Sequence, residues 1–84
     1  MKSKQEIYNN TVELIEKQEK ENYLAYYKVF LDNSKRHDIP TEEIEKIISE
    51  AYSTYKRQSE ELEEIRELAY LDLVADNNGY NQAI

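Results

Sequence analysis

Hydrophobic and polar positions follow the period of an α-helix in two long stretches separated by Pro40. Proline and glycine occur once each. Because a proline inside a helix costs roughly 3 kcal/mol and a glycine about 1 kcal/mol, few positions oppose helix formation. In the second stretch a seam recurs at steps of four and three residues, as in helices packed side by side. The seam consists of Ile44, Ile48, Ala51, Tyr55, Gln58, Leu62, Ile65 and Ala69. The pattern therefore predicts an all-α protein with two long helices.

The residues that flank the two stretches predict where each helix begins and ends. Ser3 and Glu6 have the S-x-x-E spacing of a capping box at the start of the first helix. Asp38 or Thr41 is suited to cap the second helix, and Gly79 provides a C-cap signal near its end. The predicted parts of this single domain are a helix at 4–36, a turn at 37–41, a helix at 42–76 and a loose tail at 77–84.

Each predicted helix contains a polar run, at 16–22 in the first and at 56–61 in the second. If the chain folds back at the turn, the two runs face each other, because opposed residues then have numbers that add up to about 78. This register also opposes unlike charges, Lys17 with Glu61 and Glu21 with Arg57. We therefore expect an antiparallel helical hairpin with a polar middle layer.

Apolar residues form one expected cluster on each side of this layer. The turn-side cluster contains Tyr23, Tyr26, Tyr27, Phe30, Ile44, Ile48, Ala51, Tyr52 and Tyr55. The distal cluster contains Ile7, Tyr8, Val12, Ile15, Leu62, Ile65, Ala69 and Leu73. Two helices of about 50 Å make a rod too thin to enclose a core. We expect two hairpins to form a homodimeric four-helix bundle. Alternatively, one helix breaks, with Ser59 as a new cap, and the chain folds as a three-helix bundle.

The net charge of -7 is concentrated in the second half of the chain. Residues 1–37 contain seven basic and six acidic residues, whereas residues 38–84 contain four basic and twelve acidic ones. Such a chain repels nucleic acid and anionic membranes and attracts a basic protein surface. No apolar run reaches the roughly 18 residues of a membrane span, and there is no secretory signal. Without cysteine, disulfides are excluded and a reducing compartment is compatible. We expect a cytoplasmic protein.

Two groups of side chains are candidates for binding a partner. Five acids, Glu60, Glu61, Glu63, Glu64 and Glu67, occupy eight consecutive positions and imitate a row of phosphates. Tyr23, Tyr27 and Tyr52 are expected near one end of the hairpin, where tyrosine suits a half-buried interface. The alternatives are a solvated helix face for the acids and a wet packing layer for the tyrosines.

Nothing in the chain indicates catalysis, a cofactor or a metal site. His37 is the only histidine and has no nearby ligand or nucleophile motif. The sequence therefore predicts a non-enzymatic regulator or inhibitor that blocks a basic, nucleic-acid-binding surface of a host protein. Abundant Lys, Asn, Tyr and Ile indicate an AT-rich genome, which favours a phage or mobile element and anti-CRISPR-like or anti-repressor-like action.

Two further functions remain open from the sequence. The first is a structural coiled-coil oligomerisation module, in which the heptad seam is the function and the acids provide solubility. The second is direct DNA binding through a basic group near the turn, which the overall charge opposes. That group consists of Lys28, Lys35, Arg36 and His37.

Overall fold

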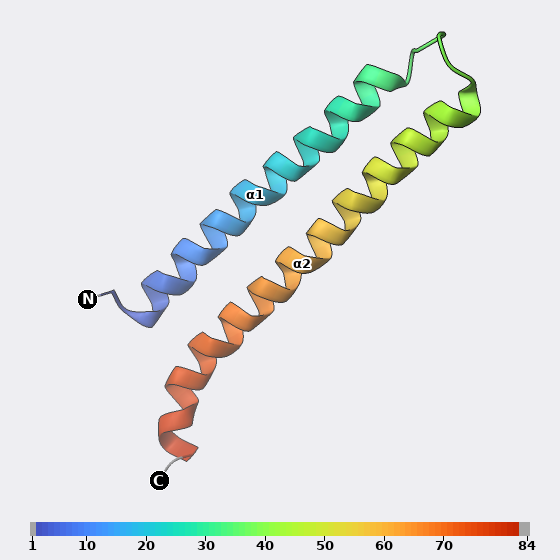
Figure 1. Cartoon of the computed structure of the whole chain (residues 1–84). Helices are drawn as coiled ribbons and strands as arrows, with labels where there is room; N and C mark the ends of the chain where they lie inside the picture. Colours follow the sequence, from blue (N-terminus) through green and yellow to red (C-terminus); the bar gives the residue numbers. More distant parts are fainter. Residues whose placement is uncertain (1, 83–84) are drawn as a thin grey trace.

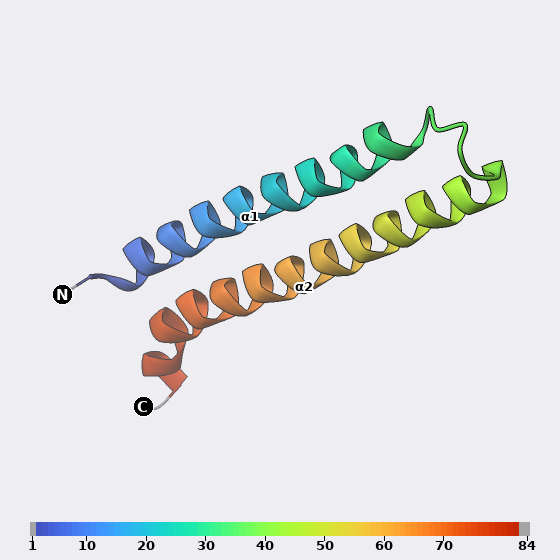
Figure 2. The same cartoon turned by 45° about the horizontal axis from the view of Figure 1, so that its top comes forward.

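The computed structural model describes residues 2–82, with side chains for residues 2–75. Two helices, α1 (Lys4–Asn33) and α2 (Thr41–Gln82), lie antiparallel and are joined by one turn (Figures 1 and 2). Both ends of the chain lie at the end of the hairpin opposite the turn, and α2 continues past the start of α1. The molecule measures 68 × 22 × 11 Å. The predicted all-α hairpin is therefore confirmed.

Neither polar run interrupts its helix. Residues 16–22 and 56–61 are α-helical throughout, so the three-helix alternative is wrong for this chain. Polar side chains such as Glu, Lys and Gln have good helix propensity, and a polar run changes what a helix packs against without breaking it. Each helix therefore presents one continuous side to the other.

The first helix begins at Lys4, as predicted, and ends at Asn33, before the predicted end at residue 36. Ser3 is its N-cap, with its Oγ accepting the backbone N–H of Glu6 at 3.2 Å. The helix ends at Asn33, where the Asn33 Nδ2 donates to the carbonyl of Val29 at 2.8 Å. Ser34 N–H donates to the carbonyl of Phe30 at 2.8 Å. The Asn33 amide thus bonds back to the preceding turn, and its Oδ1 accepts from Arg36 Nη1 at 2.9 Å, so local side-chain contacts replace a further turn of helix before position 36.

The boundaries of α2 also differ from the prediction. The carbonyl of Pro40 accepts from the backbone of Glu43 at 3.0 Å and of Ile44 at 3.2 Å, so the helix begins at Thr41. No side chain of Asp38 or Thr41 caps it, because the carboxylate of Asp38 binds Arg36 instead. The helix continues through Gly79, where a loose tail was expected. One glycine costs a helix only about 1 kcal/mol.

A seam on α1 faces α2, and the sequence analysis did not identify it. Its residues recur at steps of four and three, and each is buried or half-buried. They are Tyr8, Val12, Ile15, Glu19, Asn22, Tyr26, Val29 and Asn33. Only Ile15 (4% exposed) and Ile44 (8%) are buried hydrophobic residues within the described part. Twelve large hydrophobic side chains are exposed there, so the hairpin by itself has very little core.

The predicted register is confirmed by aromatic pairs, whereas the predicted ion pairs are wrong. In three aromatic pairs across the helices the two residue numbers add up to 78, as the register predicts. These pairs are Tyr23–Tyr55, Tyr26–Tyr52 and Tyr8–Tyr70, with ring centroids 5.9, 5.7 and 6.3 Å apart. Lys17 and Glu21 are exposed and form no ion pair with any described residue. Lys17 lies two residues, or about 200°, from Ile15 and Glu19 on the helix, so it points away from α2.

The seam of α2 changes at Ile65. The predicted seam residue Ile65 is exposed, and the half-buried Arg66 takes its place before Ala69 and Leu73. In a straight helix, positions seven residues apart rotate by about 20° around the helix axis, so a strict heptad seam turns away from the partner helix. A step of four residues from Leu62, in place of the predicted three, turns the seam back toward α1. The Arg66 Nη2 then lies 2.5 Å from the Glu19 Oε1 of α1.

Candidate protein-binding surfaces

The acidic ridge, defined as Glu60, Glu61, Glu63, Glu64 and Glu67, is exposed along α2. Two of its members lie near bases of the same helix: Glu61 is 3.9 Å from Arg57, and Glu63 is 3.8 Å from Arg66. The remaining members, which we call the acidic stripe, are Glu60, Glu64 and Glu67. Their spacing of four and three places them on one side of the helix. Within the described part of the chain, the acidic stripe forms no ion pair.

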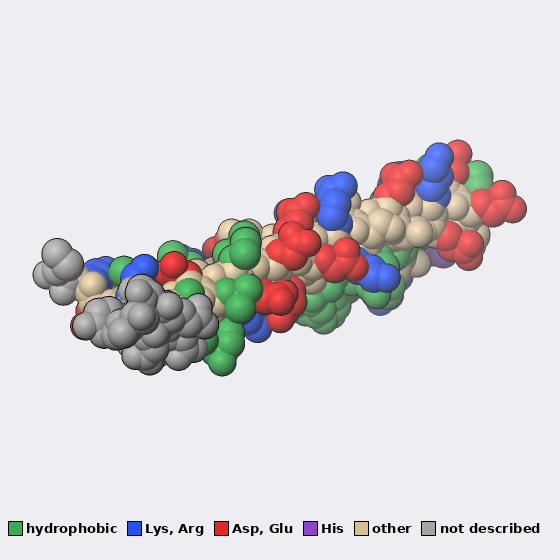
Figure 3. Space-filling model, turned by 90° about the horizontal axis from the view of Figure 1, so that it is seen from below, with side chains coloured by type: hydrophobic (Ala, Val, Ile, Leu, Met, Phe, Trp, Pro, Cys, Tyr) green, Lys and Arg blue, Asp and Glu red, His purple; other side chains and the backbone are tan. Residues whose placement is uncertain are grey.

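Exposed leucines adjoin the acidic stripe. Leu68 is 66% exposed and Leu71 is 52% exposed. Together with Glu64 and Glu67 they line a shallow hollow of about 290 Å³. In Figure 3, acidic side chains gather over the middle of the molecule with hydrophobic side chains beside them. Carboxylates next to an apolar surface suit lysine and arginine, whose aliphatic stems pack on apolar groups while their charged ends meet acids.

The tyrosine cluster consists of five rings from both helices, Tyr23, Tyr26, Tyr27, Tyr52 and Tyr55. Tyr26 is stacked on Tyr55 at 5.7 Å and meets Tyr52 edge-on. Tyr23 meets Tyr55 edge-on and stacks on Tyr27 at 6.1 Å. These are the favoured geometries of aromatic pairs. The rings therefore join the two helices near the turn.

The predicted tyrosines lie on the solvent side of this cluster. Tyr23, Tyr27 and Tyr52 are 47%, 44% and 50% exposed, whereas Tyr26 and Tyr55 are half-buried between the helices. The structure thus brings the three predicted residues together through Tyr26 and Tyr55, which pack between the helices. A partner that lies on this surface would meet three phenol rings.

The predicted tyrosines and glutamates do not form one site. Tyr52 and Glu60 are eight residues apart on α2, which corresponds to about 12 Å along the helix axis. The tyrosines contact one another across the two helices, whereas the acidic stripe lies on one side of α2 alone. The two predicted groups of partner-binding residues therefore lie on two separate surfaces.

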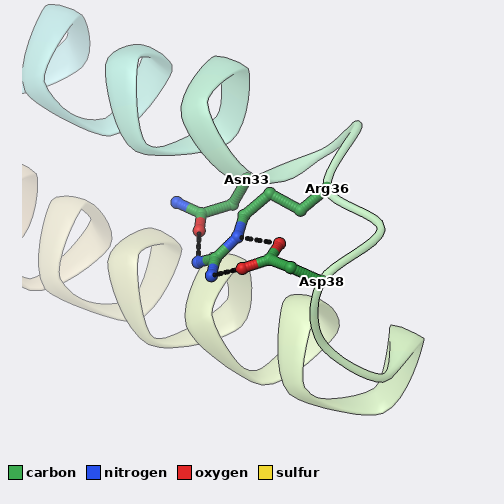
Figure 4. A network of polar contacts seen from close by, with 3 residues as sticks. All are labelled: Asn33, Arg36 and Asp38. Atoms are coloured by element: carbon green, nitrogen blue, oxygen red, sulfur yellow. Dashed lines mark hydrogen bonds and ion pairs between the residues drawn. The ribbon is translucent and has the colours of Figure 1, made fainter.

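The turn contains a compact polar network (Figure 4). Arg36 donates from Nε and Nη2 to the two carboxylate oxygens of Asp38, at 2.9 and 2.6 Å, and from Nη1 to Asn33 Oδ1 at 2.9 Å. The hydrogen bonds from Arg36 lower the pKa of Asp38 to about 2. Because its charge is matched by Asp38, Arg36 adds little to the basic group considered for DNA binding.

A hollow between the helices was not foreseen from the sequence. Its volume is about 210 Å³, and Asn22, Ala25, Tyr26, Val29, Ala51, Thr54, Tyr55 and Gln58 line it. The small side chains of Ala25, Ala51 and Thr54 leave this space. Asn22 is buried and accepts from Gln18 Nε2 at 2.8 Å. The lining has no acid–base pair or nucleophile with a base, so it supports packing and hydration but no chemistry that we recognise.

The described residues include no candidate for a metal site or a membrane span. The described residues include no group of three or more histidine, cysteine, aspartate or glutamate side chains placed to hold a metal ion. No helix in the described part is long and apolar enough to cross a membrane. No family model, curated protein or solved structure matches the chain. The two surfaces described above are therefore the candidates for function.

Proposed function

We propose that this protein is a non-enzymatic regulator that binds a basic surface of another protein through the acidic stripe and the adjoining Leu68 and Leu71. The observation that supports this proposal is that, among the described residues, Glu60, Glu64 and Glu67 form no ion pair and lie beside an exposed apolar hollow. An unpaired row of carboxylates creates a field that attracts cationic proteins and speeds their encounter. The leucines add the apolar contact that a specific interface requires.

Inhibition follows from the same chemistry if the partner binds nucleic acid. A row of carboxylates competes with phosphates for the same lysines and arginines. Small size and acidity favour an anti-repressor-like or anti-CRISPR-like inhibitor of a cytoplasmic target, encoded by a phage or mobile element. This part of the proposal depends on charge and composition alone.

A triple substitution tests the proposed surface. Glu60→Gln, Glu64→Gln and Glu67→Gln together keep the side-chain size and remove three charges. We expect the immobilised variant to capture at least ten-fold less partner from a bacterial lysate than the immobilised wild type captures. The captured proteins are identified by mass spectrometry. Captured proteins are expected to be basic, to bind nucleic acid and to elute with salt.

The matched control removes three charges elsewhere on the same helix. Glu42→Gln, Glu45→Gln and Glu50→Gln alter exposed acids that form no ion pair in the described structure, and they change the net charge equally. This control should capture the partner as the wild type does. Equal capture by both triple variants, at equal helicity by circular dichroism, would show that the stripe has no specific role.

A structural oligomerisation module is the second candidate. The exposed apolar side chains on a hairpin with two buried isoleucines favour it. In that case the assembly would be held by apolar contacts and would keep its mass from low to high salt, whereas capture through the acidic stripe would weaken as salt is added. A salt series that follows both the mass by light scattering and the capture from lysate separates the two functions, because a structural module keeps its mass and captures no salt-sensitive partner.

A further inference from the structure

We infer that a second copy of this chain packs on the side of the hairpin that carries the exposed tyrosines. This tyrosine face comprises Tyr23, Tyr27 and Phe30 on α1 with Tyr52 and Tyr70 on α2. Tyr23 contacts Tyr55 across the helices, next to Tyr52 on the same stretch of α2. Tyr70 follows Tyr52 by 18 residues, which is five complete turns, and therefore lies on the same side of α2.

The tyrosine face is not buried within a single hairpin. All five side chains of the tyrosine face are exposed, although aromatic side chains gain most from burial. The broad side of the hairpin extends over at most 68 × 22 Å, an outline large enough to contain the roughly 800 Å² that each partner buries in a stable interface. The area is therefore sufficient for a dimer, and pairing two such faces gives a four-helix bundle with a core that the single hairpin lacks.

Charge favours a second copy as the occupant. Between Tyr52 and Tyr70, steps of three and four along the same side of α2 pass Lys56, Ser59, Glu63 and Arg66. The charge of Arg66 is matched by Glu19 and Glu63, and Lys56 forms no ion pair among the described residues, whereas the acidic stripe lies on another side of the helix. Two copies of a chain with a net charge of -7 can thus meet without bringing their acidic stripes together.

Two-fold symmetry makes this face complementary to itself. The polar layer, with Glu19 and Arg66, lies between the tyrosine cluster and the Tyr8–Tyr70 pair. A two-fold axis through the middle of the face places the polar layer of one copy on that of the other, whichever way the second hairpin runs. Apolar ends then meet apolar ends, and both acidic stripes remain accessible. The dimer would be bivalent toward a basic partner.

Sedimentation equilibrium of the full chain tests this inference. We expect the wild type to have twice the mass of one chain at micromolar concentration. Tyr23→Glu with Tyr52→Glu should raise the dimer dissociation constant at least ten-fold. Leu14→Glu with Leu24→Glu is the matched control, since these residues are also exposed but do not belong to the tyrosine face. A monomeric wild type, or equal dissociation of both double variants, would overturn the inference.

Single cysteines provide a second test that does not disturb the aromatic rings. The chain has no cysteine, so Ser59→Cys and Glu60→Cys each introduce one thiol. Ser59 lies on the tyrosine-face side in the middle of α2, and Glu60 belongs to the acidic stripe. A short bismaleimide should cross-link Ser59→Cys into covalent dimers and leave Glu60→Cys monomeric. The reverse preference would contradict the proposed face.

The two proposals fail separately because they use different surfaces. The tyrosine variants are expected to lose the dimer and to keep capture of a basic partner by each single chain. The acidic-stripe variant is expected to keep the dimer and to lose capture. Loss of both properties in either variant, with helicity unchanged, would contradict the assignment of two independent surfaces.

Discussion

Arg66 is the residue that links the two helices to the acidic ridge. Its Nη2 lies 2.5 Å from Glu19 on α1, and its Nη1 lies 3.8 Å from Glu63 on its own helix. In an antiparallel pair both side chains lean toward the N-terminus of their own helix, so Glu19 and Arg66 lean toward each other. The buried Arg66 Nε has no hydrogen-bond partner. The planar guanidinium thus fills a seam position at the cost of one unsatisfied donor.

A double-mutant cycle measures what the Glu19–Arg66 pair contributes. The side chains of Glu19 and Arg66 are 42% and 33% exposed, so solvent screens the pair only in part. We expect Glu19→Gln and Arg66→Met to show a coupling of about 1 kcal/mol in urea unfolding. The Arg57–Glu61 pair, at 3.9 Å with side chains 69% and 64% exposed, is the control and should couple by less than about 0.5 kcal/mol. Equal couplings would contradict this difference.

The titration of Asp38 is a second prediction at this scale. An unfolded aspartate has a pKa near about 3.9, whereas hydrogen bonds from Arg36 hold that of folded Asp38 at about 2. A lowered folded pKa stabilises the turn above about pH 4, and this contribution is lost as the pH falls through 2. Carbon NMR of the Asp38 carboxyl should give a midpoint near pH 2.

Variants near Arg36 identify the cause of that low pKa. Arg36→Gln should move the Asp38 midpoint upward by more than one pH unit, because it removes the bidentate hydrogen bonds. Lys35→Gln removes the same charge from the neighbouring residue, which donates no hydrogen bond to Asp38, and should leave the midpoint nearly unchanged. Equal shifts would indicate a general charge effect.

At the scale of the elements, α1 depends on one buried hydrophobic residue. Ile15 is 4% exposed, whereas Ile7 of the same helix is exposed. Because substitution of a buried isoleucine removes apolar burial and leaves a cavity, Ile15→Ala should lower the free energy of unfolding by about 2–4 kcal/mol. Ile7→Ala makes the same chemical change and should cost less than about 1 kcal/mol. Thermal and urea denaturation of both variants would compare them.

The sequence predicted the number of helices, the turn and the register, because these depend on spacing along the chain. It could not predict which side of each helix faces the other where the heptad pattern drifts. Ile65 and Arg66 show this limit: spacing favoured the isoleucine, and the accumulated rotation placed the arginine in the seam. The end of α1 was misplaced because Asn33 and Arg36 form local hydrogen bonds that no propensity describes.

For the candidate site, the sequence proposed two groups of side chains but not how each group is placed on the hairpin. Composition and spacing singled out the acids and the exposed tyrosines. Their division into two surfaces depends on rotation around α2 and on contacts between Tyr23, Tyr26 and the opposite helix. Glu61 pairs with Arg57 and Glu63 with Arg66, and the other three acids form no ion pair with a described residue; these pairings likewise depend on side-chain geometry.

At the scale of the whole molecule, the elongated shape makes a prediction for the dimer. The hairpin is 68 Å long and 11 Å thick. Packing through the tyrosine face adds thickness and leaves the length nearly unchanged, whereas end-to-end association would nearly double it. Small-angle X-ray scattering of the dimer should therefore give a longest dimension close to that of one hairpin. A length near twice that value would contradict side-by-side packing.

The position of the single turn also sets the order in which the hairpin forms. Tyr26 and Tyr52 are separated by a short segment of chain, while Tyr8 and Tyr70 are separated by more than twice as much. Each doubling of a loop adds about 0.6 kcal/mol of closure entropy, so contacts near the turn form first and the helices zip toward the termini. The open end should accordingly be the first to fray, and its amide protons should exchange before those of the tyrosine cluster.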